Sequence, residues 1–496
     1  MEWERLLTKK TQVKREIEPN YWNNYPISDF EKDYKCIILS AAFRRLQDKT
    51  QVFPLDKSDF VRTRLTHSME VSTIAKQLGI MVTTNITDYL PEEFEKNTVF
   101  TLEIPSILEC AGLLHDLGNP PFGHFGEEVI RDWFKKAFQN EKFSYKGTLI
   151  KDLFNDENYH QMYSDLCNFE GNAQALRILS KIRHRPEGYD INLTYSTINT
   201  LIKYPTNSKS IKKTKDETDD VKLHKMGYFF AENDLFDEVC TENGTKITDN
   251  EYARHPLTFL MEAADDIAYA TSDLEDALKK GLFTVDQFID YYHNKLKEYD
   301  NKKTIESDKK EKSIELIKNL EERLEELDSR DKESELIAFQ KWTVYAKQWL
   351  MYVVAYSFSK NYKKIMAGKY KKDLFYEGFH TYSIKILKDA MGEFVFDTSE
   401  ILRLELSAKK IITSLLDNFI YAVIYWDDED KNYELTKADK KFINIISDNY
   451  KQDYYKAKGD DKIKNLYLRF LMVTDYISGM TDSFAKSLYQ QLNGID

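Results

Sequence analysis

Histidine and aspartate residues that could bind a metal ion are concentrated at a few places in this sequence. Only nine histidines occur in 496 residues, so the positions of His67 and His115 are informative. Asp116 directly follows His115, and Asp265 lies in a later segment rich in alanine. Two imidazoles and two carboxylates, without a thiolate, suit Mn²⁺, Mg²⁺, Fe²⁺ or Zn²⁺. An open position on such a cation would leave room for water or for a phosphoryl oxygen.

The first element that must position these residues is a predicted helix around His67. His67, Val71, Ile74 and Leu78 are spaced by four, three and four residues, so they share one helical face. The imidazole is therefore expected to point inward. A histidine on an apolar face is more often a hydrogen-bonded core residue than a ligand, and both interpretations stay open at this point.

The second predicted helix starts near Pro105 and carries His115 and Asp116 in its last turn. Gly118, followed by two prolines, stops this helix. A buried carboxylate beside an imidazole is costly unless it is paired or bound to a metal ion. A structural hydrogen bond between the two side chains is the alternative interpretation.

The third predicted helix has Pro256 in its first turn, which is a favourable position for proline. Asp265, Tyr269 and Asp273 drift by only about 80° in total, so they share one stripe of this helix. Asp265 also adjoins the small-residue packing face of this helix, which would supply the fourth candidate ligand. Asp266 lies about 100° off the stripe and is expected to form a helix cap or a surface ion pair.

Longer blocks of sequence carry a resemblance to a known family. The positions of His67, the His115–Asp116 pair and Asp265 resemble the signature of the HD-domain phosphohydrolases. The chain is more closely similar to the bacterial deoxyguanosine triphosphate triphosphohydrolases, or dGTPases. The blocks that carry this likeness are FRRLQDKTQVFPLDKSDFVRTRLTHSMEVS (43–72), AGLLHDLGNPPFGHFGEE (111–128), FEGNAQALRIL (169–179), MEAADDIAYATSDLEDA (261–277) and DYISGMTD (475–482). Five long blocks in order are far more specific than an isolated His-Asp pair.

The resemblance implies an all-α fold, with an HD-domain helical core and an additional C-terminal helical region. The implied cofactor is a divalent cation, Mn²⁺ or Mg²⁺, and its implied ligands are His67, His115, Asp116 and Asp265. The implied catalytic pair is His124 and Glu127, and positions i and i+3 at the start of a helix can indeed touch. A loop-capping role for His124 and a helix-dipole role for Glu127 are the alternatives.

The resemblance also implies the substrate, dGTP, and its hydrolysis to deoxyguanosine and tripolyphosphate. The implied substrate-binding residues are Gln51 and Val52 at the purine, Tyr269 and Asp273 at the deoxyribose 3′-hydroxyl, and Asn172, Lys203 and Tyr204 at the phosphates. Arg62 and Arg64 could bind a triphosphate bidentately or form structural salt bridges. A lysine at a solvated helix end is the ordinary alternative for Lys203. Alternative functions are hydrolysis of several dNTPs or of another nucleotide, and a regulator that binds nucleotides or single-stranded nucleic acid.

The amino-acid composition favours a folded protein that is mostly helical. The 17 glycines and 10 prolines make up about 5% of the chain, where average usage gives about 12%. Hydrophobic residues at 42% exclude a disordered solvating protein. A net charge of −12 argues against a generic binder of phosphate backbones. The four cysteines form no CxxC pair, so neither a zinc ribbon nor a disulfide framework is indicated, and a reducing cytoplasm fits best.

We expect four parts along the chain: an N-terminal arm (1–34), the HD-domain catalytic core (35–290), a charged helical insertion (291–340) and a C-terminal helical region (341–496). Within the insertion, the lysine- and glutamate-rich run 294–336 is either a heptad-like helix packed on a partner or a solvated helix. The start of the chain lacks an apolar leader, and no apolar run approaches the roughly 20 residues of a bilayer span. The resemblance further implies a homo-oligomer, with a hexamer favoured, and a possible nucleotide or single-stranded nucleic-acid effector.

Overall fold

The chain is almost wholly helical in its computed structural model. The structure describes residues 1–15, 27–55, 58–86, 89, 98–181, 191–212, 218–301, 307–376, 378–396, 398–428 and 433–495. The strands among these residues form two small antiparallel hairpins, β1 (Ser144–Tyr145) with β2 (Thr148–Leu149), and β3 (Lys246–Thr248) with β4 (Glu251–Tyr252). The predicted all-α fold is confirmed.

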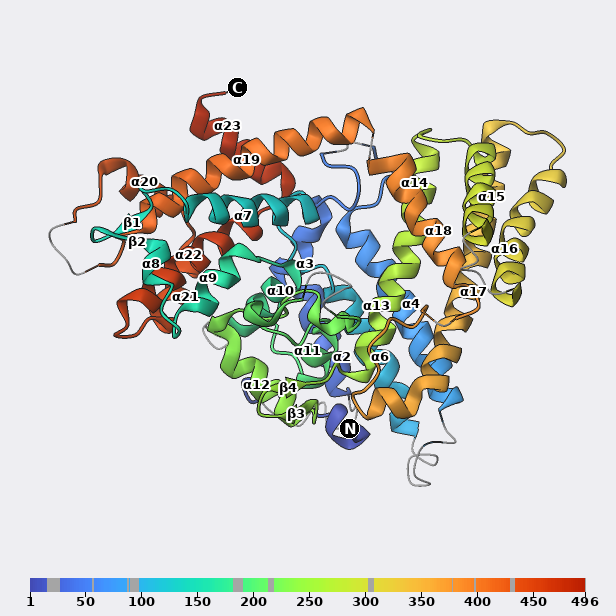
Figure 1. The fold of residues 1–496 in the computed structure, drawn as a ribbon, viewed down its shortest axis with the longest axis horizontal. Coiled ribbons are helices and arrows are strands. Elements are labelled where there is room, and N and C mark those ends of the chain that lie inside the picture. Colours follow the sequence, from blue (N-terminus) through green and yellow to red (C-terminus); the bar gives the residue numbers. More distant parts are fainter. Residues whose placement is uncertain are drawn as a thin grey trace.

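Helices account for the rest of the regular structure (Figure 1). The helices of the first half are α1 (Trp3–Leu6), α2 (Asp29–Leu39), α3 (Ala41–Arg44), α4 (Arg64–Asn85), α6 (Thr98–Leu114), α7 (Gly123–Ala137), α8 (Ile150–Leu153), α9 (His160–Cys167), α10 (Gly171–Ser180), α11 (Tyr195–Leu201) and α12 (Asn233–Glu242). The helices of the second half are α13 (Pro256–Ala268), α14 (Leu274–Lys279), α15 (Val285–Asn301), α16 (Ser307–Glu325), α17 (Lys332–Met366), α18 (Thr381–Met391), α19 (Ser399–Val423), α20 (Lys437–Ile445), α21 (Asp448–Ala457), α22 (Lys462–Ser478) and α23 (Asp482–Asn493).

The helices α4, α6 and α13 pack on one another and form the core that positions the candidate site. Their facing sides are apolar, with Val71 and Leu78 on α4, Ile107 and Ala111 on α6, and Ala264 on α13, all fully buried. Small residues at these contacts let the helix axes approach closely. Ligand candidates on all three helices are therefore held by one rigid core.

The starts of these helices agree only partly with the sequence prediction. α4 begins after Thr63, whose side chain accepts a hydrogen bond from the backbone N–H of Thr66. α13 begins at Pro256, as predicted. α6 begins at Thr98, so the prediction of Pro105 at its start was wrong, and Pro105 lies inside the helix. Proline in a helix interior removes one backbone hydrogen bond, and the packing of α6 along α4 outweighs this cost.

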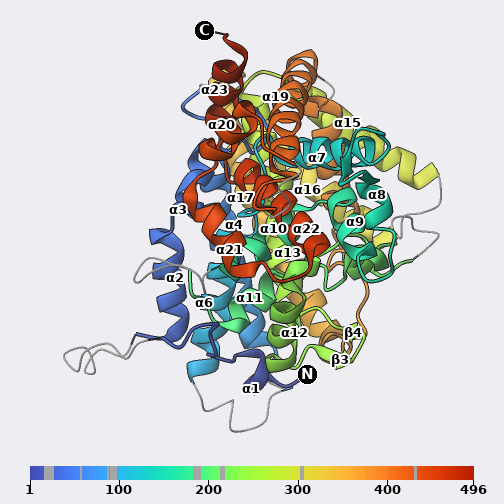
Figure 2. The ribbon, with the colours of Figure 1, turned by 90° about the vertical axis from the view of Figure 1, so that its left-hand side faces the viewer.

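The C-terminal helices share a second core with α7. Figures 1 and 2 both show α19 alongside α7, and these two helices contact each other. Trp133 of α7 donates a hydrogen bond to Asp417 of α19 at 2.8 Å. Phe134 of α7 packs against Phe470 of α22. Residues near the end of the chain are thereby brought beside residues 115–170.

The described residues of the charged run 294–336 lie mainly in α15, α16 and α17, which pack on one another, and α15 and α16 also pack on α18. Ile317, Leu320 and Leu324 are buried in this packing, and Trp342 donates a hydrogen bond to the carbonyl of Leu316. The described part of the segment thus lies mainly in three packed helices rather than in one solvated helix. The expected boundaries at 34/35, 290/291 and 340/341 fall inside α2, α15 and α17. None of the described helices has the length and apolar character needed to cross a membrane.

Candidate active site

The four predicted metal ligands lie together where α4, α6 and α13 meet. One ligand atom from each of His67, His115 and Asp116 lies within 4.8 Å of the others. Asp265 Oδ1 is 3.3 Å from His67 Nε2 and 3.4 Å from His115 Nε2. His115 and Asp116 lie one and two residues beyond the end of α6 at Leu114, whereas the sequence predicted them in the last turn of the helix. Residues 198 positions apart in the chain therefore converge on one point.

The histidine environments suit a cation. His115 Nδ1 donates a hydrogen bond to the carbonyl of Gly112 at 2.8 Å, so Nε2 points toward Asp116 and Asp265 and, in the neutral form of the ring, offers its lone pair to a cation there. This Nε2 atom is buried and has no hydrogen-bond partner among the described residues. An orphaned lone pair beside two carboxylates is an arrangement that metal binding satisfies.

The charges around the cluster also favour a cation. Burial lowers the pKa of His115, but the carboxylates of Asp116 and Asp265 outweigh it and raise this pKa to about 10. Burial raises the pKa of the two aspartates, but Arg64 beside Asp116 and Lys203 beside Asp265 hold it well below the usual range. Arg64 forms an ion pair with Asp116, and Lys203 Nζ lies 2.8 Å from Asp265 Oδ2. The two ionised aspartates thus stabilise positive charge nearby, which in this structure is carried by Arg64 and Lys203.

Arg62 and Arg64 lie in opposite environments. Arg64 lines the cavity beside the cluster, whereas Arg62 does not. Arg62 is enclosed by carboxylates: it contacts Glu70 at 3.0 Å, Glu275 at 3.2 Å, and Asp276. Its charge is therefore used in structural salt bridges, the alternative that the sequence left open.

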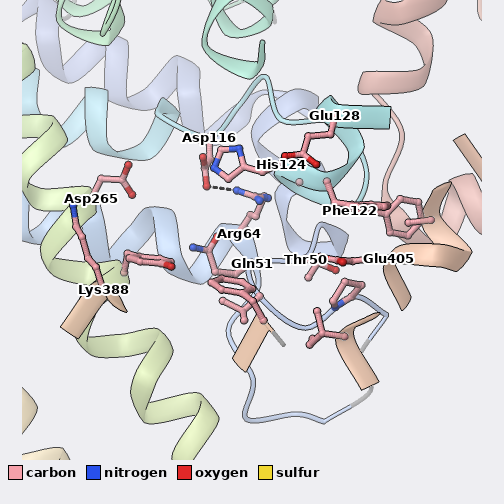
Figure 3. Close-up of a pocket in the computed structure, with 18 of the residues that line it drawn as sticks. Thr50, Gln51, Arg64, Asp116, Phe122, His124, Glu128, Asp265, Lys388 and Glu405 are labelled. Atoms are coloured by element: carbon pink, nitrogen blue, oxygen red, sulfur yellow. Dashed lines mark hydrogen bonds and ion pairs between the residues drawn. The ribbon is translucent and has the colours of Figure 1, made fainter. Parts of the chain in front are cut away.

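A cavity of about 520 Å³ opens beside the cluster (Figure 3). Seven predicted site residues line it: Gln51, Val52, Arg64, Asp116, His124, Asp265 and Tyr269. Figure 3 shows Asp265 on one side of the cavity, Asp116 and His124 near each other, and Arg64 between these residues and Gln51. Phe396, Ile401 and Glu405 line the cavity from the second half of the chain. The volume and mixed lining are typical of a small-molecule site.

His124 and Glu127 form a pair at the start of α7. His124 Nδ1 lies 3.2 Å from Glu127 Oε2, and the backbone N–H of Gly171 donates to Glu127 Oε1 at 3.0 Å. Glu127 is buried, whereas the His124 side chain is 71% exposed at the cavity. The carboxylate of Glu127 raises the pKa of His124. A fixed carboxylate thus orients one ring nitrogen and leaves the other free to handle a proton.

Two glycines, Gly123 and Gly171, lie so close to site residues that no larger side chain fits. Phe122, just before α7, and Gly123, its first residue, adopt left-handed backbone angles, with φ of 63° and 61°. A Cβ atom at Gly123 would collide with the guanidinium of Arg64. A Cβ atom at Gly171 would lie 2.5 Å from Glu127 Oε1 and would also collide with the side chain of Asn119. Both glycines are needed for close approach of backbone to site residues.

Gly171→Ala should therefore lower both activity and stability. The added methyl group must displace Glu127 or Asn119, and overpacking of this kind costs about 1 to 3 kcal/mol of unfolding free energy. Chemical denaturation and steady-state kinetics on the purified variant measure the two effects. Gly459→Ala is the matched control, because nothing lies within 4 Å of its added Cβ atom. Wild-type stability and kcat in Gly171→Ala would contradict the assigned packing.

The helix that carries Asp265 is interrupted, although the sequence predicted a continuous α-helix. Residues Tyr269–Asp273 form a π-helical turn between α13 and α14. Tyr269 lines the cavity, whereas Asp273 is buried behind it and accepts a hydrogen bond from Gln51 Nε2 at 3.4 Å. Burial raises the pKa of Asp273 to about 7. Such turns are frequent at functional sites, and hydrophobic periodicity does not reveal them.

The predicted phosphate contacts Asn172, Lys203 and Tyr204 do not line the cavity itself. Lys203 is paired with Asp265, and Asn172 donates a hydrogen bond to Glu170 Oε1 at 3.1 Å. Lys225, which sequence reasoning missed, lies 2.9 Å from the same Glu170 oxygen.

Two charged residues flank the cavity. Asp266 lies 2.6 Å from Lys388, an ion pair as expected, and both residues line the cavity. No motif marks Lys225 or Lys388 in the sequence, because each acquires its position through contacts distant in the chain.

Comparisons with known proteins agree over the whole chain. Residues 64–218 match the HD domain, and residues 380–491 match a phosphohydrolase-associated domain. The chain is 43% identical over 506 residues to a protein of Listeria monocytogenes, and both chains are covered completely. It is 35% identical over 504 residues to a protein of Synechocystis, again with both chains covered completely. A Pseudomonas aeruginosa relative is 30% identical over 499 residues, which cover 100% of this chain and 99% of the relative. All three relatives are named deoxyguanosinetriphosphate triphosphohydrolase-like protein.

Proposed function

This chain belongs to the family of deoxyguanosinetriphosphate triphosphohydrolase-like proteins with an HD domain, and from this premise we propose that it hydrolyses dGTP to deoxyguanosine and tripolyphosphate. The observation that carries the proposal is the meeting of two sets of residues at one cavity. The His/Asp cluster supplies cation ligands, and the His124–Glu127 pair supplies a proton-transfer group. Metal-assisted hydrolysis of a phosphate ester can use both.

The proposed cation is Mn²⁺ or Mg²⁺, held by His67, His115, Asp116 and Asp265. When bound, it would supply Lewis-acid polarisation of a phosphoryl oxygen. The cation would also neutralise the two aspartates, which now hold Arg64 and Lys203 in ion pairs. Both cationic side chains would then be available to bind phosphate oxygens, and the guanidinium of Arg64 can do so bidentately.

His124 is the proposed proton-transfer residue, and Glu127 is its orienting partner. Glu127 holds the Nδ1 side of the ring, so Nε2 remains to move a proton between the attacking water and the 5′ oxygen that leaves. The exposure of the imidazole to the cavity suits this role, because the proton must reach bound substrate. Burial of Glu127 keeps the orienting carboxylate away from competing water.

The sugar and base would lie along the other side of the cavity. Gln51 and Val52 are the proposed purine contacts, and the Tyr269 ring would lie against the deoxyribose, where it would exclude a 2′-hydroxyl. Asp273, which is hydrogen-bonded to Gln51, is placed behind these contacts and would act on the 3′-hydroxyl. With the sugar beside the cation, the α-phosphorus becomes the nearest target for water.

Product analysis tests this reaction. Purified protein with dGTP and Mn²⁺ or Mg²⁺ in ¹⁸O-labelled water should release deoxyguanosine and an intact tripolyphosphate that carries the label. No label is expected in the nucleoside, because the bond to the 5′ oxygen breaks on the phosphorus side. Formation of dGMP and pyrophosphate, or of dGDP and phosphate, would refute the proposed geometry. The same assay with the other dNTPs and with GTP separates a strict dGTPase from a broader nucleotide hydrolase.

The oligomeric state and the existence of an effector stay predictions. A homo-oligomer, with a hexamer favoured, is expected from the family resemblance, and light scattering on the purified protein tests it. A nucleotide or single-stranded nucleic-acid effector is tested by adding each to the dGTP assay. If the metal-stripped protein binds nucleotides and no added divalent cation gives hydrolysis, the chain would be a nucleotide-binding regulator rather than an enzyme.

A further inference from the structure

The C-terminal block 475–482 lies beside the loop 115–122, which joins α6 to α7, although none of the block's residues is a proposed ligand or substrate contact. Asp482 begins α23 and is buried. Its Oδ1 accepts a hydrogen bond from the backbone N–H of Phe122 at 2.9 Å. Its Oδ2 accepts one from the backbone N–H of Thr50 at 3.0 Å, and another from the Thr50 hydroxyl. One carboxylate therefore bridges two segments more than 350 residues earlier in the chain.

The two bridged segments belong to opposite parts of the proposed active site. Phe122 adopts a left-handed conformation and comes two residues before His124. Thr50 directly precedes Gln51, the proposed purine contact. Figure 3 shows Phe122 and Thr50 on the same side of the cavity. Asp482 thus sets the distance between the segment of the proton-transfer residue and the segment that would contact the base.

A second contact joins the same C-terminal block to the loop. The buried Lys49 donates hydrogen bonds to the carbonyls of Asn119 at 2.6 Å and Ser478 at 2.7 Å. Asn119 in turn donates to Asp116 Oδ1 at 2.6 Å. The start of the loop, near the cation ligands, and its end, at Phe122, are therefore both tied to residues 478–482.

The carboxylate of Asp482 is not used to cap its own helix. Thr481 is the N-cap residue of α23, and its side chain accepts the hydrogen bond from the backbone N–H of Phe484. A buried carboxylate is costly unless its oxygens are satisfied. Among the described residues, the donors that satisfy the Asp482 carboxylate are those of Phe122 and Thr50.

We propose that Asp482 is a positioning residue, which holds Phe122 and Thr50 so that His124 and Gln51 face one cavity in a fixed relation. This inference rests on the proposed function, because it assigns His124 and Gln51 their roles. Small misplacements of a catalytic group lower rate steeply, so a residue outside the cavity can control kcat.

Asp482→Asn tests the proposal. The side-chain amide oxygen can accept a hydrogen bond from only one of the two segments, and the amide NH₂ group then faces the backbone N–H of the other. We expect kcat to fall by about tenfold or more, with unchanged metal content, since a misplaced catalytic group reacts more slowly. Amide hydrogen exchange should become faster in the peptide that spans residues 119–124. The matched control is Asp331→Asn, because Asp331 accepts its hydrogen bonds from the first turn of its own helix, α17, and from the nearby Ser329. Wild-type kcat or wild-type exchange in Asp482→Asn would overturn the proposal.

The exchange measurement separates failure of this inference from failure of the proposed function. If the wild-type protein does not hydrolyse dGTP, exchange in residues 119–124 still decides whether Asp482 holds the loop. If Asp482→Asn does not fold, Thr50→Val is the milder variant, because it removes only the hydroxyl donor to the same carboxylate. Faster exchange in the 119–124 peptide of Thr50→Val supports the bridge, and wild-type exchange there overturns it.

Discussion

Asp265→Asn is expected to lose its divalent cation together with at least about a thousandfold of kcat/KM, because a catalytic metal ion contributes several kcal/mol. Asp265 Oδ1 is the oxygen that both His67 Nε2 and His115 Nε2 approach. The amide keeps the shape of the side chain but removes its charge. It also leaves Lys203 without its carboxylate partner, so an unbalanced positive charge would face the cation. Elemental analysis of the purified variant measures the metal directly.

The neighbouring residue Asp266 provides the matched control. Asp266 lines the same cavity but is paired with Lys388 at 2.6 Å, and burial raises its pKa to about 6. Asp266→Asn removes an equal charge one residue away and should keep both its metal content and most of its activity. Circular dichroism should report helical folds for both variants. Full metal occupancy in Asp265→Asn, with loss in Asp266→Asn, would transfer the ligand role to Asp266.

Periodicity and motif order predicted much of the fold and of the cluster. The apolar spacing after His67 indicated the buried face of α4, and the five sequence blocks indicated which residues would meet. The start of α6 could not be predicted in this way, because Pro105 reads locally as a helix start and only packing on α4 keeps it inside the helix. Spacing reveals a helical face, whereas helix ends depend on contacts made elsewhere.

The environment of each site residue was harder to predict than its identity. Arg62 and Arg64 are two residues apart and chemically identical, yet one is enclosed by Glu70, Glu275 and Asp276 while the other reaches the cavity. The carboxylates that decide this come mostly from residues more than 200 positions away. The bridge from Asp482 to Phe122 is similarly distant. No local pattern encodes such pairings.

His124→Ala should keep its metal ion and bind dGTP but turn over at least about a hundredfold more slowly, the usual contribution of a positioned acid or base. KM should change little, because the imidazole is proposed to act on a proton rather than to hold the nucleotide. Steady-state kinetics and elemental analysis on one preparation measure both. His160→Ala is the control, since His160 lies at the exposed start of α9. Near wild-type turnover in His124→Ala would leave His124 with only a structural role at the start of α7.

Glu127→Gln then tests how the pair works. The Glu127 carboxylate raises the pKa of His124 above its ordinary value of about 6.5. Glutamine can still hydrogen-bond Nδ1 but removes the negative charge, so the imidazolium loses stabilisation and its pKa falls. The limb of the kcat–pH profile that reports His124 should therefore move to lower pH, whichever protonation state is the active one. If the limb stays in place while kcat drops, Glu127 acts through geometry alone, by holding the ring and the Gly171 backbone together.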